Sequence, residues 1–269
     1  MLELPAPGPF ECLYVSPHAG VAVRSCAGRM AWELEHGLRV LVVVLFGDAV
    51  GELPEGARGL ACALPEAASR HRDYASLHAQ IEGRKPEDED AVDRAAAMIE
   101  SLARRSGARD VYAPLGVGQQ IDHCLSHEAA LRAFGAGSGR NLLLYEETPQ
   151  AAVPGAVRVR LATIGAQLPP GAASPRRAGI LRFVGGMLWS LGGLGSPHSF
   201  GERLALSGSA ARQWRAARTW RPQRAFGPRV QPVEHPVVPS GRARFWLVLP
   251  ERPGHADAAA AIMGGPAAG

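Results

Sequence analysis

Two histidine-containing segments, widely separated in the chain, hold most of the residues whose types could do chemistry. The first is Val15-Ser-Pro-His-Ala-Gly-Val-Ala-Val-Arg-Ser-Cys-Ala-Gly28, and the second is Tyr112-Ala-Pro-Leu-Gly-Val-Gly-Gln-Gln-Ile-Asp-His123. Imidazole nitrogens ligate metals and transfer protons, so His18 and His123 are candidate site residues. His18 follows a proline at the end of an apolar run, and a hydrogen-bonded turn residue is the alternative interpretation.

Alternating strand and helix patterns must position these histidines. Apolar runs predict strands over residues 12–16, 38–46, 110–114 and 141–145. Apolar residues at helical spacing predict helices over residues 26–37, 67–81, 88–105 and 126–134. The segment 47–66 is rich in Gly and Pro and predicts a loop over the sheet edge, and the pattern weakens after about residue 160.

This order of elements predicts a three-layer α/β/α fold with a mostly parallel, Rossmann-like sheet. In such sheets, sites gather beyond the C-terminal ends of the strands. Four candidate residues fall at predicted strand ends, namely His18, Asp48, His123 and Glu146. We therefore expect His18 and His123 to converge, although carboxylates at strand ends are also common as capping residues.

The two segments resemble the active-site motifs of the PIG-L/LmbE family of zinc-dependent N-deacetylases. One branch of that family carries Ser-Pro-His-x-Asp-Asp-Ala-Val-x-Ser-Cys-Gly-Gly as its first motif and His-x-Asp-His as its second. The resemblance covers about residues 12–150 and extends weakly to Arg242-Ala-Arg-Phe-Trp246. It implies a metal-dependent hydrolase of N-acyl amino sugars or related amides, with His18 and His123 as zinc ligands and Asp122 as an orienting carboxylate.

Three residues depart from the family pattern. The catalytic base of the family falls on Gly20, its carboxylate ligand on Val21, and its electrophilic histidine on Gln120. Glycine and valine have no side-chain atom that accepts a proton or ligates a metal, and glutamine cannot protonate a leaving amine. We therefore expect weak or absent zinc binding and impaired deacetylation, and a pseudoenzyme that binds a small ligand or a protein partner is the alternative.

Other residues offer further roles, each with a simpler alternative. His127 stands four residues after His123 and could replace the missing ligand, or it could be an ordinary surface residue of a helix. Arg72 falls where the family often has an arginine that reaches the pocket, and it could instead be a solvated helix residue. Asp48 and Glu146 are candidate contacts for polar groups of a substrate.

Composition limits the remaining possibilities. The 269 residues, 46% hydrophobic and 20% charged, suit a single domain over residues 1–255 followed by an Ala/Gly-rich tail over 256–269. Four cysteines without C-x-x-C spacing, and no apolar run able to cross a bilayer, predict a reduced, cytoplasmic protein without a membrane partner. Arginines with interspersed tryptophans over residues 203–229 could bind nucleic acid. A packed surface helix explains them better, so we expect no nucleic-acid partner.

Overall fold

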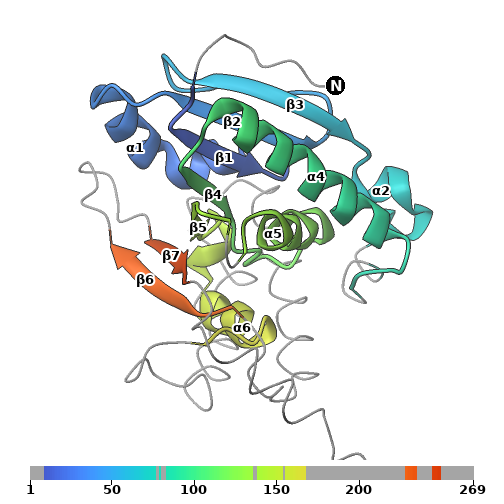
Figure 1. Cartoon of the computed structure of the whole chain (residues 1–269). Coiled ribbons are helices and arrows are strands. Elements are labelled where there is room, and N and C mark those ends of the chain that lie inside the picture. Colours follow the sequence, from blue (N-terminus) through green and yellow to red (C-terminus); the bar gives the residue numbers. More distant parts are fainter. Residues whose placement is uncertain are drawn as a thin grey trace, which may run out of the picture.

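The computed structural model describes residues 9–76, 79, 83–135, 138–153, 155–167, 228–234 and 244–249. These residues form one seven-stranded sheet in the order β3-β2-β1-β4-β5-β7-β6 (Figure 1). The strands are β1 (Cys12–Ser16), β2 (Val40–Phe46), β3 (Arg58–Leu64), β4 (Asp110–Pro114), β5 (Asn141–Tyr145), β6 (Val230–Glu234) and β7 (Arg244–Val248). The first five strands pair in parallel, β7 pairs antiparallel with β5, and β6 pairs antiparallel with β7. The predicted α/β class with a mostly parallel sheet is confirmed.

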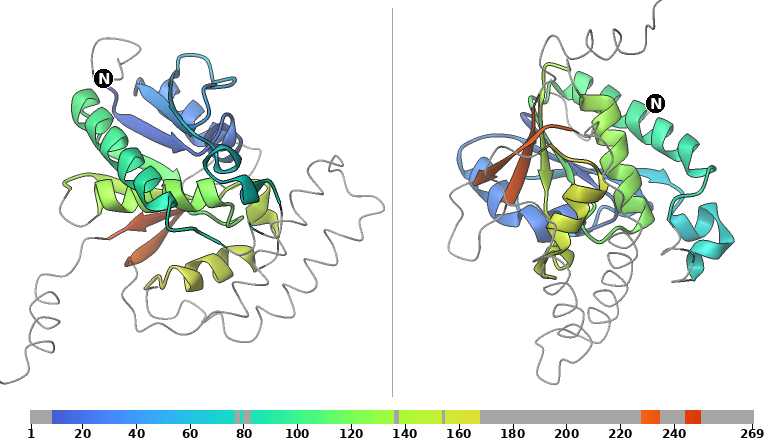
Figure 2. Two further views of the ribbon diagram at one scale, coloured as in Figure 1. Left: turned by 90° about the vertical axis from the view of Figure 1, so that its right-hand side faces the viewer. Right: turned by 90° about the horizontal axis from the view of Figure 1, so that it is seen from below.

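Helices cover both faces of this sheet, as the two views in Figure 2 show. Helix α1 (Val21–Glu35) lies on one face, and α4 (Asp88–Ser106) and α5 (Ile121–Phe134) lie on the other. Shorter elements are α2 (Ala67–Arg70), the 3-10 turns η1 (Arg72–Ala75) and η2 (Gln150–Ala152), and α6 (Ala156–Thr163). The result is the predicted three-layer arrangement.

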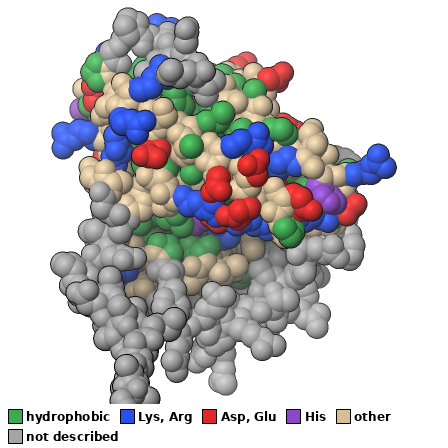
Figure 3. All heavy atoms as spheres, turned by 45° about the vertical axis from the view of Figure 1, so that its right-hand side comes forward, with side chains coloured by type: hydrophobic (Ala, Val, Ile, Leu, Met, Phe, Trp, Pro, Cys, Tyr) green, Lys and Arg blue, Asp and Glu red, His purple; other side chains and the backbone are tan. Residues whose placement is uncertain are grey.

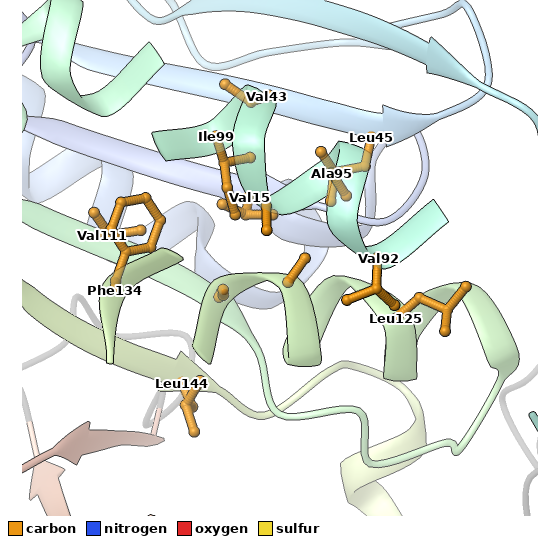
Figure 4. Packing of buried hydrophobic residues seen from close by; sticks show 14 of the residues in the cluster. Val15, Val43, Leu45, Val92, Ala95, Ile99, Val111, Leu125, Phe134 and Leu144 are labelled. Atoms are coloured by element: carbon orange, nitrogen blue, oxygen red, sulfur yellow. The ribbon is translucent and has the colours of Figure 1, made fainter. Parts of the chain in front are cut away.

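The period-2 alternation of strand side chains divides the core into two clusters. Alternate residues of β1, such as Leu13 and Val15, pack toward α4 and α5, where Ile99 and Leu125 meet them (Figure 4). The intervening residues of β1 pack toward α1 with Val21, Ala22, Cys26 and Met30. Burial of the central strands on both faces explains why their sequences are continuous apolar runs.

Two predicted elements were wrong. The predicted loop 47–66 contains β3, which is an edge strand. Its Cys62 and Leu64 are buried and Leu60 is partly buried, although Gly59 and Ala63 have low strand propensity. The predicted helix 67–81 ends after α2 at His71, whose backbone is extended, and continues as η1. This break brings Arg70 and Tyr74 onto one buried carboxylate, and those polar contacts outweigh helix continuation.

Surface charges and apolar segments bear on possible partners. On the face in Figure 3, basic and acidic side chains are interspersed instead of being gathered by sign. In the part of the chain that the structure describes, no helix is both long and apolar enough to cross a membrane. Cys12, Cys26 and Cys62 are buried thiols, and Cys124 is partly buried. Residues 168–227, which include most of the arginine- and tryptophan-rich stretch, and the tail 256–269 lie outside the described residues.

A buried carboxylate joins α1 to the two central strands. Glu33 is fully buried and accepts hydrogen bonds from the hydroxyls of Tyr14 and Tyr112, each at 2.7 Å, and from Arg29 Nε at 2.8 Å. The two tyrosine rings are stacked with centroids 4.3 Å apart. Burial raises the pKa of both phenols, so they remain protonated donors.

We predict that Glu33→Ala lowers the free energy of unfolding by about 3–5 kcal/mol, because it leaves a buried guanidinium and two phenols without their acceptor. Denaturant unfolding followed by circular dichroism measures this. Glu35→Ala on the same helix changes an exposed residue and should cost within about 0.5 kcal/mol. Equal losses in the two variants would contradict a structural role for the buried cluster.

Candidate functional site

The site lies where the direction of strand order reverses, between the C-terminal ends of β1 and β4. The first motif forms the turn from β1 into α1, and Ser16 fixes that turn. Its hydroxyl donates to the carbonyl of His18 at 2.6 Å and accepts from the amide of Ala22 at 3.0 Å. Gly20 precedes the helix with φ of +76°, a left-handed conformation that glycine adopts without strain. His18 is thereby held at the mouth of the sheet with 31% of its side chain exposed.

Asp122, in the first turn of α5, accepts contacts on both carboxylate oxygens. His18 Nε2 lies 3.2 Å from Oδ2, which also accepts the amide of Ala67 at 3.0 Å. Arg70 places a guanidinium nitrogen 2.7 Å from Oδ1. Burial alone opposes ionisation, but His18 and Arg70 outweigh it and lower the pKa of Asp122. Asp122 is therefore a poor proton acceptor, and its contacts suit it to orienting His18.

Arg70 is the buried cation of the site. Only 7% of its side chain is exposed, and its Nε lies 3.0 Å from Asp88 Oδ1 at the start of α4. Its guanidinium also sits 4.9 Å from the ring centroid of Phe46, at the end of β2. Asp88 in turn accepts hydrogen bonds from the hydroxyl of Tyr74 and from the amide of Lys85. Arg70 thus connects the carboxylate beside His18 to a second buried carboxylate.

A second imidazole–carboxylate pair lies beside the first. His123 is buried, and its Nδ1 is 3.3 Å from Oε1 of Glu147. Glu147 is fully buried and accepts the amides of Gly116 and Val117, at 2.7 and 3.1 Å. Ring centroids of His18 and His123 are 5.8 Å apart. The expected convergence of the two histidines at the strand ends is confirmed.

The remaining predicted residues occupy different surroundings. Arg72 and Asp48 are exposed, and Glu146 accepts a hydrogen bond from the indole of Trp246 at 3.0 Å. Gln120 precedes the first residue of α5 and is partly buried. Sequence reasoning therefore missed Arg70 and Glu147. Arg70 lies two residues from the predicted Arg72, and Glu147 lies next to the predicted Glu146. The helix break at His71 and the turn after β5 decide which residue of each pair reaches the site.

His127, the alternative third ligand, is buried below the site. Its Nδ1 lies 3.0 Å from the carbonyl of Pro114, and its Nε2 has no hydrogen-bond partner among the described residues. Burial, with the nearby Arg160, lowers the pKa of His127 to about 3, so the ring is neutral. Within the described ranges, no three or more His, Cys, Asp or Glu side chains form a group that could hold a metal ion.

Zinc is the metal that the motif resemblance implies, and the residues present do not fit it. Val21, at the position of the carboxylate ligand, is 5% exposed and packs with Cys26 and Met30 in the apolar cluster under α1. His18 directs Nε2 to Asp122; because an ionised carboxylate only accepts, that nitrogen carries a proton and cannot ligate a metal in this orientation. His18 and His123 alone fall short of the three protein ligands of a catalytic zinc site.

Comparisons with solved structures return deacetylases. A deacetylase of teicoplanin biosynthesis matches with 18% identity and a TM-score of 0.49, over 90% of this chain and 99% of that chain. A zinc-inhibited form of teicoplanin deacetylase matches with 16% identity and a TM-score of 0.47, over 90% and 99%. An antimicrobial pseudoaglycone deacetylase matches with 17% identity and a TM-score of 0.42, over 89% and 97%.

No protein-family model and no curated protein sequence matches the chain. Deacetylation is also the activity of the family that the two motifs resemble. At these identities and TM-scores, a structural similarity assigns neither activity nor substrate. The function of this chain must therefore be inferred from the residues of the site itself.

We predict that Arg70→Met destabilises the fold by about 3–5 kcal/mol, because Asp122 and Asp88 then remain buried without their shared cation. Arg72→Met, two residues away and exposed, should change the free energy of unfolding by less than about 0.5 kcal/mol. Chemical denaturation of both variants measures the difference. If Arg72→Met costs as much as Arg70→Met, the assignment of the buried cation is wrong.

Proposed function

We propose that this chain binds an N-acyl amino sugar or a related amide at the His18–His123 site, and that its zinc-dependent deacetylation is impaired or absent. The observation that carries the proposal is the buried Val21, which places a hydrocarbon side chain at the position where the resemblance requires a carboxylate ligand. Gly20 removes the base at the neighbouring position.

The retained polar groups suit binding better than hydrolysis. Asp122 is occupied by Arg70, Ala67 and His18, and its lowered pKa makes it a weak base. Gln120 can donate a hydrogen bond to a ligand oxygen, but its amide cannot deliver a proton to a leaving amine. His18 is partly exposed and can meet a ligand, while Asp122 holds its ring. These features support recognition without efficient bond cleavage.

A metal-dependent hydrolase with an altered ligand set is the second candidate. The observation in its favour is the 5.8 Å separation of the His18 and His123 rings, each backed by its own carboxylate. Turning His18 away from Asp122 would be required before its Nε2 could ligate a metal. The two candidates therefore differ in metal content and in the response to a restored carboxylate.

For the metal, we predict that dialysed wild-type protein holds substoichiometric zinc and that a chelator leaves its melting temperature unchanged. In chelator, the Val21→Asp variant should melt at a lower temperature than the wild-type protein, because the substitution buries a carboxylate without a partner. Zinc should then raise the melting temperature of Val21→Asp, because the metal binds the folded state only. Elemental analysis and differential scanning fluorimetry measure both quantities.

Val23→Asp, a partly buried valine on the same helix, is the matched control for this experiment. It should lower the melting temperature without any recovery in zinc. Stoichiometric zinc in the wild-type protein, lost in His127→Ala, would instead support the hydrolase with three histidine ligands.

For activity, we predict no measurable deacetylation of N-acetylglucosamine derivatives by the wild-type chain, since loss of a general base alone costs about 10²–10⁴-fold. The triple variant Gly20→Asp, Val21→Asp, Gln120→His should recover zinc binding and trace hydrolysis. Space permits the first change, because a Cβ on Gly20 would lie 3.5 Å from Arg24, although its φ of +76° adds strain. A fluorogenic amine assay measures turnover; robust zinc-dependent turnover by the wild type would overturn the proposal.

A further inference from the structure

Two glutamines near the site each have a buried side-chain atom that makes no hydrogen bond within the described residues. Gln150 is 8% exposed, and its Oε1, an acceptor, has no partner among the described residues. Gln119 is partly buried, and its Nε2, a donor, is likewise buried and without a partner there. A buried polar group without a partner costs about 1–3 kcal/mol, so such groups are rare unless a ligand or water completes them.

The loop after β4 meets the loop after β5 at Gly118. A Cβ added to Gly118 would lie 2.7 Å from Cγ of Gln150, so the side chain of Gln150 fills the space above this glycine. Gln119 is the next residue in the chain, so the two glutamines belong to adjoining parts of these loops.

Hydrogen bonds of Glu147 connect these two loops to the candidate site. Glu147, three residues before Gln150, accepts the amides of Gly116 and Val117 and contacts His123. The loops that carry the two glutamines are therefore joined to each other and to His123 through one carboxylate.

The backbone of Gln119 supports a specific role for its side chain. Its φ is +52°, in the left-handed region that side-chain-bearing residues seldom occupy and that glycine adopts freely. Glycine stands one position before it, so a glycine at 119 would relieve the strain at little cost to the turn. Strained non-glycine residues cluster at ligand sites, because the side chain is retained for another purpose.

We propose that Gln119 and Gln150 form a donor–acceptor pair that recognises the amide group of a ligand. The ligand carbonyl accepts from Gln119 Nε2, and the ligand N–H donates to Gln150 Oε1. A free ammonium offers no acceptor to Gln119, so the pair selects the acylated compound over the amine. This inference rests on the proposed function for the identity of the sugar. It assigns selectivity for the amide to two residues outside the His18–Asp122 and His123–Glu147 pairs.

The test uses Gln119→Met and Gln150→Met, which keep side-chain length and remove the polar atoms. Affinities for N-acetylglucosamine and for glucosamine are measured by NMR titration of the full chain. Each substitution should weaken N-acetylglucosamine about tenfold, the equivalent of one hydrogen bond of about 1.4 kcal/mol, and leave glucosamine unchanged. Each should also leave the melting temperature of the free protein equal or higher, since a buried unpartnered group has been removed.

N-methylacetamide serves as a probe that contains the amide and no sugar. It should shift the side-chain NH₂ resonances of Gln119 and Gln150, and a matched exchange of Gln231→Met, at an exposed position of β6, should leave those shifts in place. If N-methylacetamide produces these shifts but N-acetylglucosamine does not bind, the proposed sugar ligand is wrong and the amide pair stands.

The opposite result separates the two ideas equally well. If N-acetylglucosamine binds the wild type and both methionine variants with one Kd, the pair is overturned and the proposed function stands. A lower melting temperature in the free methionine variants, with no change in either titration, shows that internal water or structural bonding satisfies these amides, and this also overturns the pair.

Discussion

The carboxylate of Asp122 is the interaction on which the arrangement of the site depends. It joins three segments far apart in the sequence, because His18 follows β1, Ala67 and Arg70 belong to α2, and Asp122 itself begins α5. Each segment supplies a donor to a carboxylate that is 5% exposed. A buried charge is tolerated only when it is paired, so the three segments must meet for Asp122 to be buried in its ionised form.

The central part of the fold could be predicted because its signals are local. Apolar runs for β1, β2, β4 and β5, with glycines soon after β2 and β4, indicate a doubly covered parallel sheet before any tertiary contact is known. β3 lacked such a signal, since Gly59, Ala61 and Ala63 have low strand propensity and their strand state depends on pairing with β2. The same applies to β7, whose pairing with β5 is long-range, and β6 joins the sheet only through β7.

The site was predictable where a motif fixes a residue at a strand end, and not where tertiary contacts choose between neighbours. His18, Asp122 and His123 are close together as expected. The choice of Arg70 over Arg72 depends on where α2 stops, and a helical pattern over 67–81 contains no sign of that break. Glu146 and Glu147 are consecutive residues after β5, and side chains on consecutive residues of an extended segment point to opposite sides. Glu147 therefore contacts His123, while Glu146 contacts Trp246.

Donors of the chain itself contact both buried carboxylates, and Asp122 Oδ1 lies in an ion pair with Arg70 without a hydrogen bond among the described residues. Asp122 receives Arg70, the amide of Ala67 and His18, while Asp88 receives Arg70, Tyr74 and the amide of Lys85. One guanidinium charge is thus shared by two carboxylates, and neutral donors provide the rest. A carboxylate introduced at position 21 for zinc would therefore require His18 to leave Asp122 before both could bind the metal. The Arg70 network thus joins α2, α4 and α5 beside His18 through side chains and a backbone amide of the chain itself.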